Sequence, residues 1–287
     1  MTETPKKNQG EAFPSAFRFT KMTGAGNDFL IFDALKNPFP KVDRSLFAQS
    51  LCRRSLSIGA DGVVFLEPSA DSKNAFKWDF YNADGSSAEF CGNAARCVAR
   101  FAFENKHAAR EMTFETSAGD VTAEILATNQ VRIQMPKPEI IEKTLTIPVG
   151  EHIKIEVMHL NTGVPHVVKV NDDWDQEYLF DMGSYLRNHD LFKKSGGVNA
   201  TFYEVIGPSK IHSVTFERGV ENVTLACGTG AVAAALSALS GGMVSPVEVL
   251  VPGGTLFVEM DSNTSSVFLV GEARFICDGH LKSEALL

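Results

Sequence analysis

The chain carries one pattern twice, and this duplication limits the folds that it can adopt. The phrase FCGNAARC at 90–97 has a counterpart in ACGTGAVA at 226–233, and each places Cys-Gly before a run of helix-forming residues. A strand–turn–strand pattern follows each phrase, at 112–125 and at 247–260. Upstream, KMTGAGNDFLIFDA at 21–34 corresponds to LNTGVPHVVKVN at 160–171. The phrases recur in one order at nearly equal spacings, which predicts two similar halves, although glycine-rich turns alone also recur in many α/β proteins.

The order of elements predicts an α+β fold with two pseudo-symmetric domains. Each domain is expected to be a β-sheet or barrel wrapped around a central α-helix. We expect the domains at 17–136 and 137–275, with the join marked by prolines at 136, 138 and 148. Residues 1–16 are polar and lack an apolar run, which predicts a flexible leader and not a secretion signal.

Composition narrows the classes of partner. The 287 residues are 44% hydrophobic and 22% charged, the mix of an ordinary folded protein. The net charge of -8 provides no basic field for nucleic acid or an anionic membrane. The longest apolar stretch, at 231–239, is far shorter than the roughly 20 residues of a membrane span. These features favour a small-molecule partner and exclude a transmembrane segment.

The five cysteines predict a reducing, cytoplasmic location, because their odd number in a large chain does not suit a disulfide framework. They lack zinc-ligand spacing, so we expect no metal site. Cys91 and Cys227 stand at the two predicted helix starts, where unpaired N–H groups stabilise a thiolate and predict a low pKa. If the two thiols face one cleft, they could invert the configuration at the carbon of a carbon acid. One thiolate would remove a proton from one face, and the other thiol would return a proton to the opposite face. The alternatives are simple packing, which we expect for Cys52, Cys97 and Cys277, and a redox pair.

Seven phrases together resemble a known family. They are KMTGAGNDF, GADG at 59–62, NADGSSAEFCGNAARC at 82–97, NTGVPHVV, VNATF, ERGVENVTLACGTGA at 217–231 and LVPGGTL. As a set they are similar to the pyridoxal-phosphate-independent diaminopimelate epimerases, over nearly all of 17–287. The resemblance implies the diaminopimelate epimerase-like fold, with a C-terminal strand at 276–287 returning to the first domain. It implies cofactor-independent conversion of L,L- to meso-diaminopimelate in lysine biosynthesis, and it leaves open a homodimer.

The family's functional residues fall on matching positions of this chain. The catalytic thiol pair falls on Cys91 and Cys227, and His166 and Glu217 match positions that tune the thiol pKa. The substrate-binding positions fall on Asn27, Asn82, Gly92, Asn93, Asn199, Glu217, Arg218, Gly228 and Thr229. Arg218 is expected to bind the distal carboxylate of the substrate through its guanidinium fork. Two positions depart from the family: Val164 stands where many members have Asn, and Gly62 stands where some have Gln.

Two other functions fit parts of the pattern. Proline racemases and hydroxyproline epimerases share the paired Cys-Gly motifs, but their first motif carries His at the position of Asn93. Their second motif usually has Ser-Pro before the cysteine. A catalytically silent binding protein on the same fold is the other alternative, and the presence of both thiols argues against it.

Overall fold

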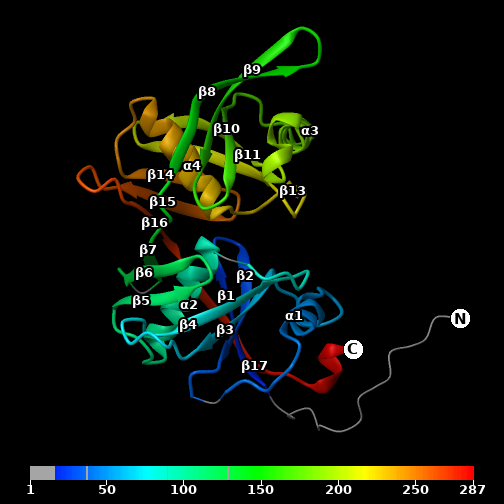
Figure 1. Ribbon diagram of the computed structural model, residues 1–287, viewed down its shortest axis with the longest axis vertical. Helices are drawn as coiled ribbons and strands as arrows, with labels where there is room; N and C mark the ends of the chain where they lie inside the picture. Colours follow the sequence, from blue (N-terminus) through cyan, green and yellow to red (C-terminus); the bar gives the residue numbers. More distant parts are fainter. Residues whose placement is uncertain (1–16, 37, 89, 128) are drawn as a thin grey trace, which may run out of the picture.

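Two lobes follow one another along the long axis of the molecule in the computed structural model (Figure 1). The structure describes residues 17–36, 38–88, 90–127 and 129–287, and the leader predicted at 1–16 lies outside them. The first lobe contains the helices α1 (Arg44–Cys52) and α2 (Gly92–Glu104). Its strands are β1 (Arg18–Gly24), β2 (Asn27–Asp33), β3 (Gly62–Glu67), β4 (Lys77–Asn82), β5 (Glu111–Thr116), β6 (Gly119–Ile125) and β7 (Gln130–Gln134).

The second lobe contains α3 (Gln176–Arg187), α4 (Gly228–Ser240) and a 3₁₀ helix at Asp190–Ser195. Its strands are β8 (Glu139–Val149), β9 (Ile153–Asn161), β10 (Pro165–Val170), β11 (Asn199–Gly207), β12 (Lys210–Glu217), β13 (Asn222–Val223), β14 (Val247–Val251), β15 (Gly254–Met260) and β16 (Val267–Glu272). The chain ends with β17 (Arg274–His280) and a 3₁₀ helix at Ser283–Leu286. No helix in the described ranges is long and apolar enough to span a membrane.

Strand pairing repeats between the lobes. β1 is antiparallel to β2, β2 is parallel to β3, β3 is antiparallel to β4, β4 is parallel to β5, and β5, β6 and β7 continue antiparallel. The series β9, β10, β11, β12, β14, β15 and β16 has the same directions in the same order. The helices repeat too, since α1 and α3 follow the second strand of each series, whereas α2 and α4 precede the fifth. This repetition confirms the prediction of two similar α+β halves.

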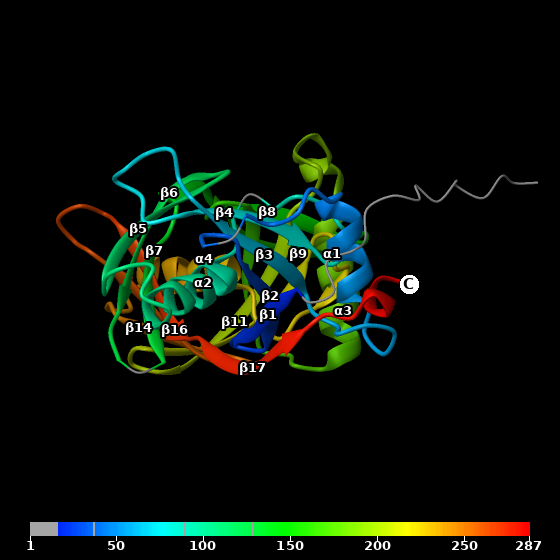
Figure 2. The same ribbon diagram turned by 90° about the horizontal axis from the view of Figure 1, so that it is seen from below.

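Two strand pairings join the lobes into one continuous sheet system. β7 of the first lobe pairs antiparallel with β16 of the second, and β17 then returns to pair antiparallel with β1. In Figure 2 the return of β17 is visible as the red ribbon that crosses beneath the blue β1. The predicted return of the chain end at 276–287 thus corresponds to β17, which begins two residues earlier at Arg274.

The two central helices form the core that the sheets wrap. The sequence of α4 is rich in alanine, the best helix former, and apolar around its whole circumference, as expected of a buried helix. α2 buries Ala94, Ala95 and Val98, and both helices contribute to one apolar core. The helices also contact each other. This arrangement brings the residues at the two helix starts toward one place.

Candidate active site

Cys91 and Cys227 are the N-cap residues of α2 and α4, as the sequence predicted. Both have extended backbones, and both are free thiols. The Gly230 N–H, in the first turn of α4, donates to Cys227 Sγ at 3.4 Å. Each sulfur therefore lies where a helix presents unpaired N–H groups.

The starts of the two helices meet at a contact of small residues. A Cβ added to Gly228 would lie 3.7 Å from Gly92 Cα and 3.1 Å from Leu269 Cδ2. A Cβ on Gly92 would lie 3.1 Å from the same Leu269 atom. The two glycines thus occupy equivalent places around one leucine side chain of β16. This geometry supports the convergence of the two cysteine-bearing helix ends.

Amide side chains connect Cys91 to the second lobe. The Cys91 thiol donates to Asn27 Oδ1 at 3.8 Å. Asn93, which is 2% exposed, donates from Nδ2 to Asn27 Oδ1 at 3.2 Å and to Ala226 O at 3.1 Å. Ala226 directly precedes Cys227 in the sequence. Hydrogen bonds of Asn27 and Asn93 therefore connect Cys91 to the backbone next to Cys227.

A second polar group surrounds Cys227. Thr229 Oγ1 lies 3.3 Å from Cys227 Sγ and 3.0 Å from His166 Nε2. The other ring nitrogen of His166 lies 3.0 Å from Thr201 Oγ1, and Asn199 Nδ2 lies 3.4 Å from His166 Nε2. His166 is fully buried, and burial, with the charge of Arg218, lowers its pKa to about 3. The imidazole is therefore neutral at any ordinary pH.

Glu217 and Arg218 lie at the end of β12, beside this polar group. Thr224 Oγ1 donates to the Glu217 carboxylate, and Arg218 N donates to Asn199 Oδ1 at 2.8 Å. The Arg218 guanidinium donates to Ser195 O at 3.0 Å and to Gly197 O at 3.3 Å. Those two contacts involve carbonyl oxygens, so the guanidinium retains N–H groups that a carboxylate could use.

The expected low thiol pKa is wrong in this structure. Burial raises the pKa of both thiols, and the charge of Glu217 raises them further. Hydrogen bonds from the backbone of Ala94 and Asn93 lower the pKa of Cys91, but they do not outweigh burial. Burial also raises the pKa of Glu217. The N–H groups at the helix start do lower the pKa of Cys91, as expected, but the burial of the thiol raises it by more.

The remaining cysteines occupy different surroundings. Cys52 and Cys97 are buried in the apolar core, and burial raises the pKa of each to about 12. Cys277 is exposed on β17. Among the described residues, no three His, Cys, Asp or Glu side chains are grouped so that they could hold a metal ion.

A charged cluster beneath Asn27 was not found from the sequence. Asn27 Nδ2 donates to Asp61 Oδ2 at 2.7 Å, and Arg54 pairs with Asp61 at 2.9 Å and with Asp28 at 2.7 Å. Lys21 pairs with Asp28 at 2.9 Å. Because Asp61 only accepts hydrogen bonds when ionised, it fixes the Asn27 amide with its oxygen toward Cys91. Asp61 lies in the GADG phrase at 59–62, so the acidic residue of that phrase was a sequence signal for this cluster.

Asn82 is not joined to the cysteines by a direct hydrogen bond in the described structure. Its Nδ2 donates to Ser86 Oγ at 3.0 Å, and it pairs in register with Gly62. Gly62 has no room for a side chain, because a Cβ there would lie 2.6 Å from Phe80 and 2.8 Å from Tyr81 O. Val164 is half-buried in the turn between β9 and β10, and its carbonyl accepts from Thr162 N at 3.2 Å.

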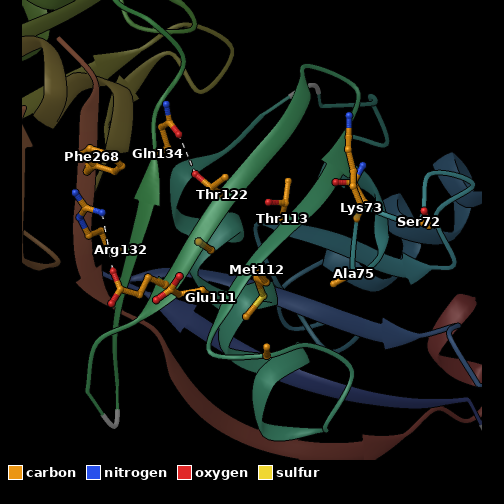
Figure 3. A pocket seen from close by; sticks show the side chains of 14 residues that line it. Ser72, Lys73, Ala75, Glu111, Met112, Thr113, Thr122, Arg132, Gln134 and Phe268 are labelled. Atoms are coloured by element: carbon orange, nitrogen blue, oxygen red, sulfur yellow. Dashed lines mark hydrogen bonds and ion pairs between the residues drawn. The ribbon is translucent and has the colours of Figure 1, made fainter. Parts of the chain in front are cut away.

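A groove in the described residues lies elsewhere, between strands of the first lobe and β16 (Figure 3). It has a volume of about 540 Å³ and is lined by side chains of β5, β6, β7 and β16, including Thr113, Thr122, Gln134 and Phe268. Its cations are already paired, Lys73 with Asp71 and Asp120, and Arg132 with Glu124 and Glu259. None of the sequence-predicted site residues lines it.

Two comparisons with known proteins match most of this chain. The family model for diaminopimelate epimerase matches residues 19–141 and 158–276. A diaminopimelate epimerase of Aquifex aeolicus is 36% identical over 281 residues, covering 93% of this chain and 99% of the relative. One of Carboxydothermus hydrogenoformans is 37% identical over 275 residues, covering 91% and 98%. The chain belongs to the diaminopimelate epimerase family.

Solved structures extend the likeness beyond the diaminopimelate epimerase family. A hydroxyproline epimerase of Agrobacterium vitis has a TM-score of 0.71 at 16% identity, covering 96% of this chain and 94% of that one. A PhzF-family phenazine biosynthesis protein of Bacillus anthracis has a TM-score of 0.69 at 12% identity, covering 93% and 99%. These neighbours show a shared fold and confirm the predicted fold class.

Proposed function

We propose that this chain interconverts L,L- and meso-diaminopimelate by transferring protons through Cys91 and Cys227, without a cofactor. The observation that carries this proposal is the meeting of two equivalent helix N-termini, each with a cysteine at its N-cap. Membership in the diaminopimelate epimerase family supplies the substrate. The exposed Cys277 and the four other free thiols support a reducing cytoplasm, where the reaction would serve lysine biosynthesis.

The proposed chemistry moves one proton off and one proton onto the same carbon. The thiolate of one cysteine takes the proton from the α-carbon, so a C–H bond breaks and an S–H bond forms. The thiol of the other cysteine gives its proton to the opposite face, which breaks its S–H bond and forms the new C–H bond. The N–H groups of the first turns, at Gly92-Asn93 and Gly228-Thr229, would hold the carboxylate and the negative charge that develops on it.

Formation of the thiolate depends on the bound substrate. Burial and the charge of Glu217 raise the pKa of both thiols, which disfavours the thiolate. The substrate's α-ammonium group brings a positive charge into the cleft, and an opposite charge nearby lowers a thiol's pKa. The neutral His166 and Thr229 keep the surroundings of Cys227 polar without adding a competing charge. The base is therefore generated where and when the substrate is present.

The distal end of the substrate would bind near Arg218. Arg218 is half-buried, and its planar guanidinium fork suits a carboxylate. Asn199, held by Arg218 N, and the amides of Asn27 and Asn82 would complete the polar lining. Val164 contributes an aliphatic side chain where many family members have an amide. Recognition of the distal group would therefore rely more heavily on Arg218 than in those members.

The test is an activity assay of purified protein with no added cofactor. We expect it to convert L,L-diaminopimelate to the meso form and to leave L-proline unchanged. Cys91→Ala and Cys227→Ala should each lower kcat by orders of magnitude with the fold retained, whereas Cys52→Ala, the control, should not. Near-normal turnover by Cys91→Ala would contradict the mechanism. Racemisation of proline would favour the racemase alternative, and binding of diaminopimelate without turnover would favour a silent binding protein.

A further inference from the structure

Arg96 is a fully buried cation that the proposed reaction does not use. Its side chain is 0% exposed, on the α2 helix that begins at Cys91. No carboxylate forms an ion pair with it among the described residues. The nearby Glu272 carboxylate instead pairs with Arg274 at 3.2 Å. A buried guanidinium without a carboxylate partner carries a large desolvation cost, so an anion placed near it would be strongly favoured.

The hydrogen bonds of Arg96 lead to the start of its own helix. Nη2 donates to Asn93 Oδ1 at 2.8 Å, and Nη1 donates to Gly92 O at 3.2 Å. Nε donates to Glu272 O at 3.4 Å. Because a guanidinium only donates, it fixes the Asn93 amide with its oxygen inward and its NH₂ group toward Asn27 and Ala226.

Two glycines form the slot for this guanidinium. A Cβ added to Gly24 of β1 would lie 3.3 Å from Arg96 Nη2. A Cβ added to Gly271 of β16 would lie 3.1 Å from Nε and 3.3 Å from Cζ. Neither glycine has a positive φ, so backbone conformation does not require glycine at these positions. Space explains both glycines: a Cβ on Gly24 would also lie 3.1 Å from Asn93 O, and a Cβ on Gly271 would lie 2.6 Å from Leu256 Cδ2, so the guanidinium fits where neither glycine has a side chain.

We propose that Arg96 is a positioning residue, which orients Asn93 and uses its buried charge to favour anions, the Cys91 thiolate and a substrate carboxylate, at the start of α2. The inference about the carboxylate rests on the proposed function, whereas the inference about the thiolate does not. Arg96 touches neither cysteine by a hydrogen bond in the described structure, so its effect passes through Asn93, the helix start and electrostatics.

Other groups also act on Cys91, and the test must separate Arg96 from them. Cys97 lies on the same helix, Glu217 comes from β12, and Cys227 comes from the start of α4. Asp61 binds the amide of Asn27, whose oxygen accepts from the Cys91 thiol. None of these four groups is a cation. Arg96 brings a positive charge, and that charge lowers the pKa of Cys91. Removing it should therefore shift the titration of Cys91 upward.

The experiment measures alkylation of Cys91 by iodoacetamide between pH 7 and 12, with the modified peptide identified by mass. For Arg96→Gln we expect the midpoint to rise by about one pH unit, so that the rate at pH 8 falls about tenfold. The matched control is Arg100→Gln, one turn later on α2, because Arg100 binds Ala273 O and does not contact Asn93. Equal midpoints in Arg96→Gln and in the wild-type protein would overturn the proposal.

Arg96→Lys provides the second variant, should Arg96→Gln fail to fold. Lysine keeps a cation in the slot but cannot hold Gly92 O and Asn93 in the fork geometry. We expect its Cys91 midpoint to stay near the wild-type value while kcat/KM for diaminopimelate falls about tenfold. A wild-type kcat/KM in Arg96→Lys would overturn the positioning role. Alkylation needs no turnover, so a shifted midpoint in a protein that does not epimerise diaminopimelate would reject the proposed function and keep the role of Arg96.

Discussion

His166 should make the stability of the protein depend on pH. The folded protein buries the imidazole completely between Thr201 and Thr229, and its pKa there is about 3, against 6.5 for an ordinary histidine. As the pH falls, the unfolded chain binds the proton first, so protonation favours unfolding. The stability associated with neutral His166 is therefore fully present above pH 6.5 and is lost progressively as the pH falls toward 3.

The size of this effect follows from the two pKa values. At pH 5 the solution is about one and a half units below the pKa of the unfolded histidine, and each unit corresponds to about 1.4 kcal/mol. His166 alone should therefore lower the free energy of unfolding by about 2 kcal/mol between pH 8 and pH 5. The result changes little if the folded pKa lies anywhere near 3, because the folded imidazole is still unprotonated at pH 5.

Urea unfolding at pH 8 and pH 5 measures this difference. His166→Gln replaces the imidazole by an uncharged amide that can still donate and accept hydrogen bonds. Its loss of unfolding free energy between the two pH values should be smaller than that of the wild-type protein by about 2 kcal/mol. His152→Gln is the control, because the His152 side chain is 91% exposed, and its loss should match the wild type. Equal losses in His166→Gln and the wild-type protein would refute the reasoning.

Three further predictions concern the cleft. Arg218→Ala should lower kcat/KM for diaminopimelate about a hundredfold, since a charge-assisted bidentate contact is lost, and steady-state kinetics with an unchanged value would place Arg218 outside the site. Air oxidation without ligand should link Cys91 and Cys227 in a disulfide and abolish activity until a reductant is added; full activity with two free thiols would show that they do not face each other. Gly228→Ala should raise KM, because its methyl group would press on Leu269 where the two helices meet, and an unchanged KM would show that this contact does not shape the site.

The local elements and their repetition could be predicted from the sequence. Cys-Gly followed by helix formers located the starts of α2 and α4, and alternating apolar residues around glycine located β5–β6 and β14–β15. These signals depend only on residues that are close together in the sequence. The domain boundaries at 136 and 275 stay a prediction, because β7–β16 and β17–β1 pair across the halves and long-range pairing leaves little trace in local pattern.

The electrostatics of the site could not be predicted in the same way. The position of Cys91 and Cys227 at helix starts indicated stabilised thiolates, but the sequence does not reveal how completely each thiol is buried. Arg96 stands in the motif GNAARC, four residues after Gly92, and could have been placed on a helix face. It is fully buried, and the glycines beside its guanidinium, Gly24 and Gly271, come from opposite ends of the chain.

Two-base proton transfer is tested most directly by epimerisation in deuterated water. Cys91 and Cys227 exchange their thiol protons with solvent before substrate binds, and a closed cleft then slows exchange of the proton just removed. Early in the reaction the product should therefore carry deuterium at its inverted carbon, while recovered substrate stays largely unlabelled, whichever isomer is supplied. Deuterium appearing first in recovered substrate, or product that keeps its original proton, would contradict the assignment of one thiol to each face.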